Sequence, residues 1–168
     1  MKSLTIFAIA LLISFASLGQ APSPGSKLIQ TVGFTEVTVE YSRPGVKDRT
    51  IFGDLLKYGE VWRVGANAAT KITFNKTVKI GDSNLSGPYA ILAIPGEKEW
   101  TVNFYSITSF ATYTNDKPTV STTVKPSKLT EPVETFTIDI NNIRNTSATI
   151  DFIWEKTKVS IPFTVGTE

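Results

Sequence analysis

Apolar and polar residues alternate along most of this chain, and this period of two constrains its fold more than any other feature. Val37, Val39 and Tyr41 fall on one face of an extended segment, and Thr38 and Glu40 fall on the other. Side chains alternate in this way along a strand that is buried on one face only. The same pattern, rich in Val, Ile, Thr and aromatic residues, recurs at residues 136–140, 148–154 and 159–165. It predicts half-buried β-strands.

The remaining segments complete an all-β prediction. Tyr89–Pro95 is apolar on both faces, which predicts a central strand covered on both sides. Glu155–Lys158 is typical of a hairpin turn between the last two strands. Turn signals between segments indicate about nine or ten short strands, and crossover helices for a parallel fold are missing. We therefore expect an antiparallel β-sandwich or an open barrel.

One short helix is expected within this β-fold. Thr50–Tyr58 is the single helical candidate. Asp48 or Thr50 would be its N-cap, and Gly59 would end it, because a short polar side chain and a glycine suit these two positions.

The N-terminus has the features of an export signal. Lys2 supplies a positive charge, Leu4–Phe15 is largely apolar, and small residues precede a cleavage point after Gly19. The alternative, an uncleaved membrane anchor, would require a longer apolar run of about 18 residues. We expect residues 1–19 to be a signal peptide and no membrane span to remain after its removal.

The rest of the chain is expected to be one exported domain. Residues 20–27, with two prolines, a glycine and serines, predict a flexible leader, and residues 28–168 a single β-sandwich domain. The chain has no cysteine. Since a secreted chain without disulfides suits a bacterial compartment, we expect a periplasmic or extracellular location in a bacterium.

Composition excludes several kinds of function. The chain has no histidine and no cysteine, so neither Ser-His-Asp nor Cys-His chemistry is possible, and zinc and copper lack their usual ligands. No calcium-binding loop pattern is present. The formal charge is +2 before Lys2 leaves with the signal, and acids are interleaved with the lysines. We therefore expect no metal, no cofactor and no nucleic-acid partner.

Three of the four arginines and a tryptophan are concentrated in Ser42–Phe74. Arg43 continues the apolar stripe of residues 37–41, so alternation points its side chain toward the covered face. A buried guanidinium must be paired or it is costly. The candidate acidic partners in the same segment are Asp48, Asp54 and Glu60.

Motifs across nearly the whole mature chain resemble a known family. They lie at Tyr41–Pro44, Ile51–Leu55, Tyr58–Phe74, Gly87–Tyr89, Ile94–Val102, Glu134–Ile138 and Trp154–Pro162. The chain resembles the bacterial secreted family catalogued as domain of unknown function 2911. The resemblance implies a β-rich, exported protein and no established activity. Two departures are apparent: Ala68 stands where the family has an acid, and Ser106–Thr123 lacks a Trp-Gly pair and a strand of the family pattern.

Two non-catalytic roles are open for the arginine-rich segment. In the first, a polar network fixes the connection between two sheets; its candidates are Arg49, Asp48, Asp54 and Glu60. In the second, a concave end of the sandwich binds a ligand; its candidates are Arg43, Arg63, Asn67 and Trp62. Arginine grips carboxylate or phosphate, and tryptophan stacks on rings. The partner would be an anionic sugar, a cell-envelope fragment, another small molecule or an envelope protein.

The alternative from a different class is a glycan hydrolase. Without histidine, the available chemistry is a pair of carboxyl groups that flank a glycosidic bond. Asp48, Asp54 and Glu60 are the clustered acids near the arginines. Acids in loops are normally solvated, so no catalytic residue is assigned.

Overall fold

A computed structural model describes residues 22–107 and 117–167, so the expected signal peptide (1–19) and part of Ser106–Thr123 lie outside it. Within the described residues the chain has strands and no helix. Accordingly, no helix there is long and apolar enough to cross a membrane. The eight strands are β1 (Gly25–Val32), β2 (Thr35–Ser42), β3 (Thr70–Ile80), β4 (Ser83–Ile94), β5 (Trp100–Ser106), β6 (Val120–Val124), β7 (Ser127–Asn141) and β8 (Ser147–Val165).

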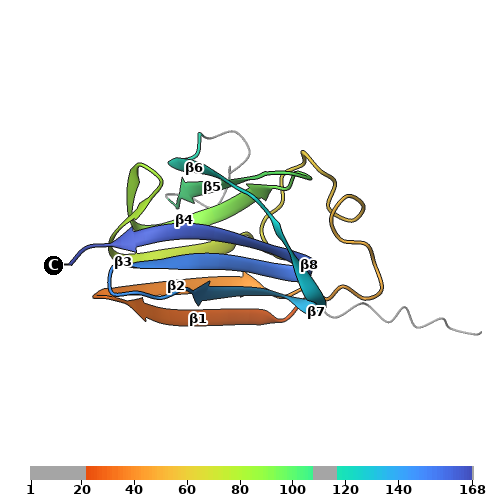
Figure 1. Cartoon of the computed structure of the whole chain (residues 1–168), viewed down its shortest axis with the longest axis horizontal. Coiled ribbons are helices and arrows are strands. Elements are labelled where there is room, and N and C mark those ends of the chain that lie inside the picture. The colour runs from red at the N-terminus through yellow and green to blue at the C-terminus, as the bar shows by residue number, and fades with distance from the viewer. Residues whose placement is uncertain (1–21, 108–116, 168) are drawn as a thin grey trace, which may run out of the picture.

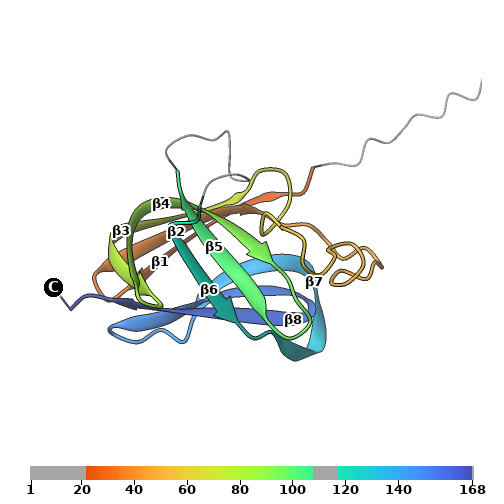
Figure 2. The same ribbon diagram turned by 90° about the horizontal axis from the view of Figure 1, so that it is seen from above.

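All strand pairings are antiparallel, as predicted. β1 to β6 lie in sequence order, and β8 joins them by pairing with the end of β3 on one side and with β7 on the other. Figure 1 shows this arrangement with the strands nearly parallel to the long axis, and Figure 2 shows β7 and β8 as a second layer against β1–β6. The sheet folds over without closing into a barrel.

β8 is a continuous run of extended residues that turns back on itself. The Nζ atom of Lys158 lies 2.7 Å from Oδ2 of Asp151, although seven residues of straight strand span about 23 Å. The chain must therefore reverse between them, and Glu155, with φ of +53°, marks the turn. The figure shows two antiparallel arms (Figure 1). This is the hairpin that Glu155–Lys158 predicts.

The core lies between the two layers and contains a cluster of aromatic rings. Trp62 and Trp154 stack with ring centroids 6.0 Å apart, and Phe52 approaches Trp100 to 4.9 Å. Phe136 lies 5.0 Å from Trp62. β4 supplies the two-faced burial predicted for Tyr89–Pro95, since residues 89–93 are all buried. The alternating burial along β2, β7 and β8 follows the sequence pattern.

The edge of β7 that faces away from β8 is covered by the chain that leaves β2. The Tyr41 hydroxyl accepts from the amide of Ile138 and donates to its carbonyl, at 3.1 and 3.3 Å. Arg43 Nε donates to the Phe136 carbonyl at 3.1 Å. The Phe136 amide donates to the carbonyl of Pro44 at 2.9 Å. An edge strand leaves alternate backbone groups unpaired, and those of Phe136 and Ile138 are satisfied here.

The predicted short helix at Thr50–Tyr58 is wrong. This segment forms successive turns, in which the Leu56 amide donates to the Ile51 carbonyl at 2.8 Å. That spacing of five residues is wider than the spacing of four in an α-helix. Gly53 has φ of +94°, which no right-handed helix accommodates. The N-cap and stop signals therefore belong to a loop.

Two segments complete this description. Val61–Gly65 makes a single bridge to β4, from Trp62 to Ala93, and is not a strand. β1 begins at Gly25, three residues inside the expected leader 20–27. The Arg43 amide donates to the Pro24 carbonyl at 2.8 Å, so the chain is already held by backbone bonds at this point.

Candidate functional site

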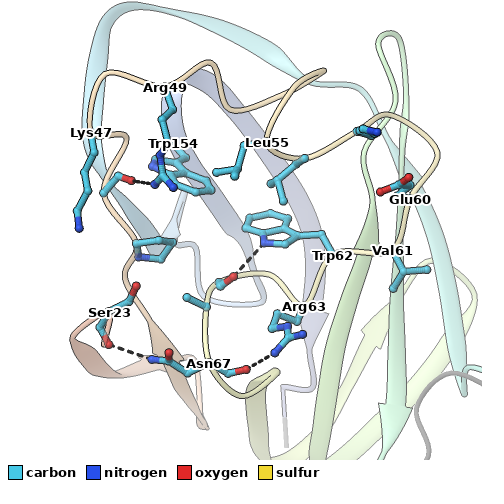
Figure 3. Close-up of a pocket in the computed structure, with 16 residues that line it drawn as sticks. Ser23, Lys47, Arg49, Leu55, Glu60, Val61, Trp62, Arg63, Asn67 and Trp154 are labelled. Atoms are coloured by element: carbon cyan, nitrogen blue, oxygen red, sulfur yellow. Dashed lines mark hydrogen bonds between the residues drawn. The ribbon is translucent and has the colours of Figure 1, made fainter. Parts of the chain in front are cut away.

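A cleft of about 490 Å³ opens at the end of the molecule where β2 leads into the long loop before β3. Its walls come from the strap Pro44–Arg49, the turns Leu55–Arg63 and the segment Gly65–Asn67. Ser23 and Trp154 complete the lining from opposite ends of the chain (Figure 3). The volume falls within the range of small-ligand pockets.

The charge lining the cleft is strongly unbalanced. Four cations line it, and Glu60 is its single acid. The cations are Lys47, Arg49, Lys57 and Arg63. None of these five groups takes part in an ion pair among the described residues, where the three ion pairs lie elsewhere. All five are exposed, so water now solvates charges that an anionic ligand would neutralise.

Backbone carbonyls hold both cleft arginines in place. Arg49 donates from Nε to the Val46 carbonyl at 2.9 Å and from Nη2 to the Gly45 carbonyl at 2.7 Å. Arg63 donates from Nη1 to the carbonyl of Asn67. A guanidinium has five N–H donors, so each retains several for a ligand. Because their positions are already fixed, binding would cost little additional side-chain entropy.

The lower wall of the cleft is a strained segment. Val64, Gly65 and Asn67 have φ of +53°, +143° and +59°, and positive φ is a genuine outlier for a β-branched residue such as Val64. The Thr70 hydroxyl donates to the Val64 carbonyl, which helps to hold this conformation. A Cβ at Gly65 would meet the Ser42 carbonyl oxygen at 2.9 Å, so glycine is required here.

Asn67, one of the predicted binding residues, ties this segment to the start of the domain. Its Nδ2 donates to the Ser23 carbonyl at 3.1 Å (Figure 3). The same atom donates to the Ser42 hydroxyl at 3.2 Å. Its side-chain amide group is therefore engaged within the protein, and its exposed face lines the cleft.

The two indoles at the floor of the cleft differ in one respect. Trp62 is 5% exposed, and its Nε1 donates to the Gly65 carbonyl at 3.0 Å (Figure 3). Trp154 is 2% exposed, and its Nε1 is buried without a hydrogen-bond acceptor among the described residues. With so little exposed surface, Trp62 is a core residue that presents an edge to the cleft, and it offers no open face on which a sugar ring would stack.

Arg43, predicted to bind ligand, does not line the cleft. Its Nη2 donates to the Thr137 hydroxyl at 2.8 Å, in addition to the Nε bond to the Phe136 carbonyl described above. Alternation correctly directed Arg43 toward the covered side, where it is half-buried. Its partners are the backbone and a hydroxyl group of β7, and no acid pairs with it among the described residues.

The predicted network of arginines and acids is not assembled. Asp48 and Asp54 are exposed and do not line the cleft, whereas Glu60 lies at its rim. Arg49, the fourth candidate of that network, binds backbone carbonyls. The structure therefore brings together Arg49, Glu60, Trp62, Arg63 and Asn67 at one cleft and leaves Arg43, Asp48 and Asp54 outside it.

Ala68, the departure from the family pattern, also lies outside the cleft. It borders a separate shallow hollow together with Lys27 and Lys71. Glu40 borders the same hollow and already pairs with Lys71 at 3.2 Å, and surface ion pairs of this kind carry little energetic weight.

Sequence reasoning missed three charged residues that the structure makes prominent. Lys47 and Lys57 line the cleft. Lysines are scattered along the whole sequence, whereas the arginines are concentrated in one segment, so nothing local singled out these two lysines. Asp151 is 0% exposed and pairs with Lys158, the last residue of the predicted hairpin turn. The sequence does hold one indication of Asp151, which is an acid between Ile150 and Phe152 in the middle of an apolar strand.

The environment of Asp151 favours its charged form. Its Oδ2 accepts from Asn141 Nδ2 at 2.9 Å in addition to the Lys158 pair. Burial alone would raise the pKa of Asp151, but the ammonium of Lys158 and its hydrogen bonds outweigh burial and lower the pKa below its ordinary value. Both residues belong to β8, so the pair joins the two arms of its hairpin.

No metal site is evident in the part of the chain that the structure describes, because no three acidic, histidine or cysteine side chains come together there.

Comparison with curated proteins found no match, and comparison with solved structures found none either. A sequence model of one family matches residues 23–163, which covers nearly all of the described fold. The chain therefore belongs to the family described as protein of unknown function (DUF2911).

Proposed function

We propose that this protein is an exported, non-catalytic binding module that holds an anionic component of the bacterial cell envelope, such as an anionic sugar or an envelope fragment, in the cleft. The observation that carries the proposal is the set of four unpaired cations around one cavity with a single acid. The N-terminal signal pattern supports export, and for an exported chain the absence of cysteine suits a bacterial periplasmic or extracellular location.

Electrostatics favours an anion of more than one charge. The whole chain carries a formal charge of only +2, so an excess of three positive charges at one cleft is a local feature. Clefts lined by one sign of charge concentrate counter-ions and accelerate their association. Exposed charges are screened by salt, so affinity for the ligand should fall as ionic strength rises.

A glycan hydrolase is less well supported. Hydrolysis of a glycosidic bond requires two carboxyl groups that face each other across the bond. Glu60 is the single carboxylate that lines the cleft among the described residues, and Asp48 and Asp54 lie outside it. The geometry therefore favours binding of an anionic ligand over hydrolysis of a glycan.

The test is calorimetric binding of uronic-acid oligosaccharides and neutral oligosaccharides of equal length, at low and at moderate salt. We expect the acidic series to bind, and the double variant Arg49→Gln/Arg63→Gln to bind at least tenfold more weakly, since charge-assisted bonds contribute about 1.5–3 kcal/mol each. Arg144→Gln is the matched control, because Arg144 is exposed and lies away from the cleft, in the turn between β7 and β8.

Two results would count against the proposal. One is equal affinity of the double variant and the wild type for every anion that binds. The other is turnover of a glycan that depends on Glu60, which would favour the hydrolase.

A further inference from the structure

Three exposed apolar side chains lie on the loop beside the cleft. Leu55, Tyr58 and Val61 are 45%, 42% and 61% exposed, and they fall within seven residues of one another. Leu55 and Val61 line the same cleft as the four cations. Single exposed apolar residues are common on protein surfaces, but three of the six large ones among the described residues lie on this one loop.

The loop that carries these side chains is held by its own backbone. The Gly53 amide donates to the Leu56 carbonyl at 2.8 Å, the Glu60 amide to the Lys57 carbonyl at 3.3 Å, and the Gly59 amide to the Pro95 carbonyl at 2.9 Å. The last bond ties the loop to the end of β4. These bonds satisfy part of the loop's backbone, which lowers the cost of moving the loop into a less polar medium.

Apolar side chains surrounded by cations are the pattern that anionic lipid surfaces recognise. The loop projects beyond one end of the strands, clear of the sheet faces (Figure 1). Tyrosine is suited to the interface, because its ring is apolar and its hydroxyl reaches water. In the sequence, Lys57 lies beside Tyr58 and Arg63 follows Val61 by two residues, with Glu60 as the single acid of the loop.

We infer that the Leu55–Arg63 loop docks on an anionic lipid bilayer, with Leu55, Tyr58 and Val61 entering the headgroup region and headgroup phosphates occupying the cleft. The inference rests on the proposed function, since the phosphate is the anion that the cleft cations hold. A soluble anion would not account for the exposed apolar side chains, whereas a bilayer would. Each cation near an anionic surface should contribute about fivefold to the partition coefficient.

The test is co-sedimentation with vesicles of phosphatidylcholine alone and with vesicles that also contain phosphatidylglycerol. We expect binding to the anionic vesicles and little to the neutral ones. The variant Leu55→Ser/Val61→Ser should bind at least tenfold more weakly, because it loses apolar area that the bilayer would bury. Ile29→Ser is the matched control: Ile29 is 55% exposed on β1, outside the cleft, and its loss should leave binding unchanged.

Soluble glycerol phosphate separates this inference from the proposed function. Tyr58 is exposed and does not line the cleft, so we expect Tyr58→Ser to bind glycerol phosphate as the wild type does and anionic vesicles more weakly. We expect Arg49→Gln/Arg63→Gln to lose both ligands. Binding of the soluble anion without preference for anionic vesicles would overturn the membrane inference and leave the proposed function standing. Undiminished vesicle binding by Leu55→Ser/Val61→Ser would also overturn the inference. Retention of both ligands by the arginine variant would overturn the two proposals together.

Discussion

The two stacked indoles allow a sharp test of how the cleft floor is stabilised. Replacement of Trp62 or Trp154 by phenylalanine removes an indole N–H and a similar volume in each case. The rings lie 6.0 Å apart with an interplanar angle of 20°, and Phe136 packs against both. Because the two sites share their surroundings, the cost of the lost ring volume should be nearly equal and should cancel in the comparison.

The contributions of the two indole N–H groups to stability do not cancel in this comparison. Trp62→Phe leaves the buried carbonyl of Gly65 without the donor that now lies 3.0 Å away, and an unsatisfied buried acceptor costs about 1–3 kcal/mol. Trp154→Phe removes a buried donor that has no acceptor among the described residues, so it relieves a penalty of similar size. We therefore expect Trp154→Phe to be more stable than Trp62→Phe by about 2 kcal/mol or more.

Urea denaturation followed by far-ultraviolet circular dichroism would measure both free energies of unfolding. In a chain of this size, each kcal/mol corresponds to about 2–4 °C in Tm, so calorimetry should separate the two variants by several degrees. Equal free energies of unfolding, or a lower value for Trp154→Phe, would refute the reasoning. Native circular dichroism spectra of both variants at low temperature are the control that the fold is retained.

Three further predictions concern other parts of the fold. Lys158→Met should destabilise the protein by about 3 kcal/mol at neutral pH, because it leaves the Asp151 carboxylate buried and unpaired. In the wild type the pKa of Asp151 is lowered, so the stabilisation from this group is present above its ordinary value of 3.8 and is lost as pH falls below it. In the variant the pKa should be raised instead, so its deficit relative to the wild type should shrink between pH 7 and pH 4 in urea titrations; a constant deficit would contradict this. Gly65→Ala should cost more than about 2 kcal/mol through backbone strain and a clash, whereas Gly59→Ala, with open space around its Cβ position, should cost about 1 kcal/mol by thermal denaturation; equal costs would exclude the clash. Tyr41→Phe should lower the free energy of unfolding by about 1–3 kcal/mol and speed hydrogen exchange at the β7 amide that its hydroxyl binds, whereas unchanged exchange would show that the cap is dispensable.

The strands were predictable because burial on alternate faces is a local property of a sequence. Alternation placed Val37, Val39 and Tyr41 on the inner face, and continuous apolar character placed Tyr89–Pro95 at the centre of the sheet, as the structure confirms. The helix prediction was wrong at Thr50–Tyr58, because cap residues also suit turns and the segment gains its stability from its contacts with the end of β4 and with the aromatic core.

The site was less predictable, because its parts meet only in three dimensions. Alternation indicated which way Arg43 points, but its acceptor on Phe136 lies 93 residues away. The positive φ of Val64 runs against the preference of a β-branched residue, so no local rule places it. Lys47 and Lys57 reach the cleft because the strap and turns fold toward each other, which residue spacing alone does not reveal.

The covered edge of β7 has a consequence for how the protein behaves at high concentration. β7 is fifteen residues long, and an uncovered strand of that length would template pairing with other copies of the chain and hence fibre growth. The Tyr41 hydroxyl and the Arg43 guanidinium occupy hydrogen-bonding groups that an incoming strand would need. We therefore expect the arginine that we first considered for ligand binding to protect this edge from pairing with another copy of the chain.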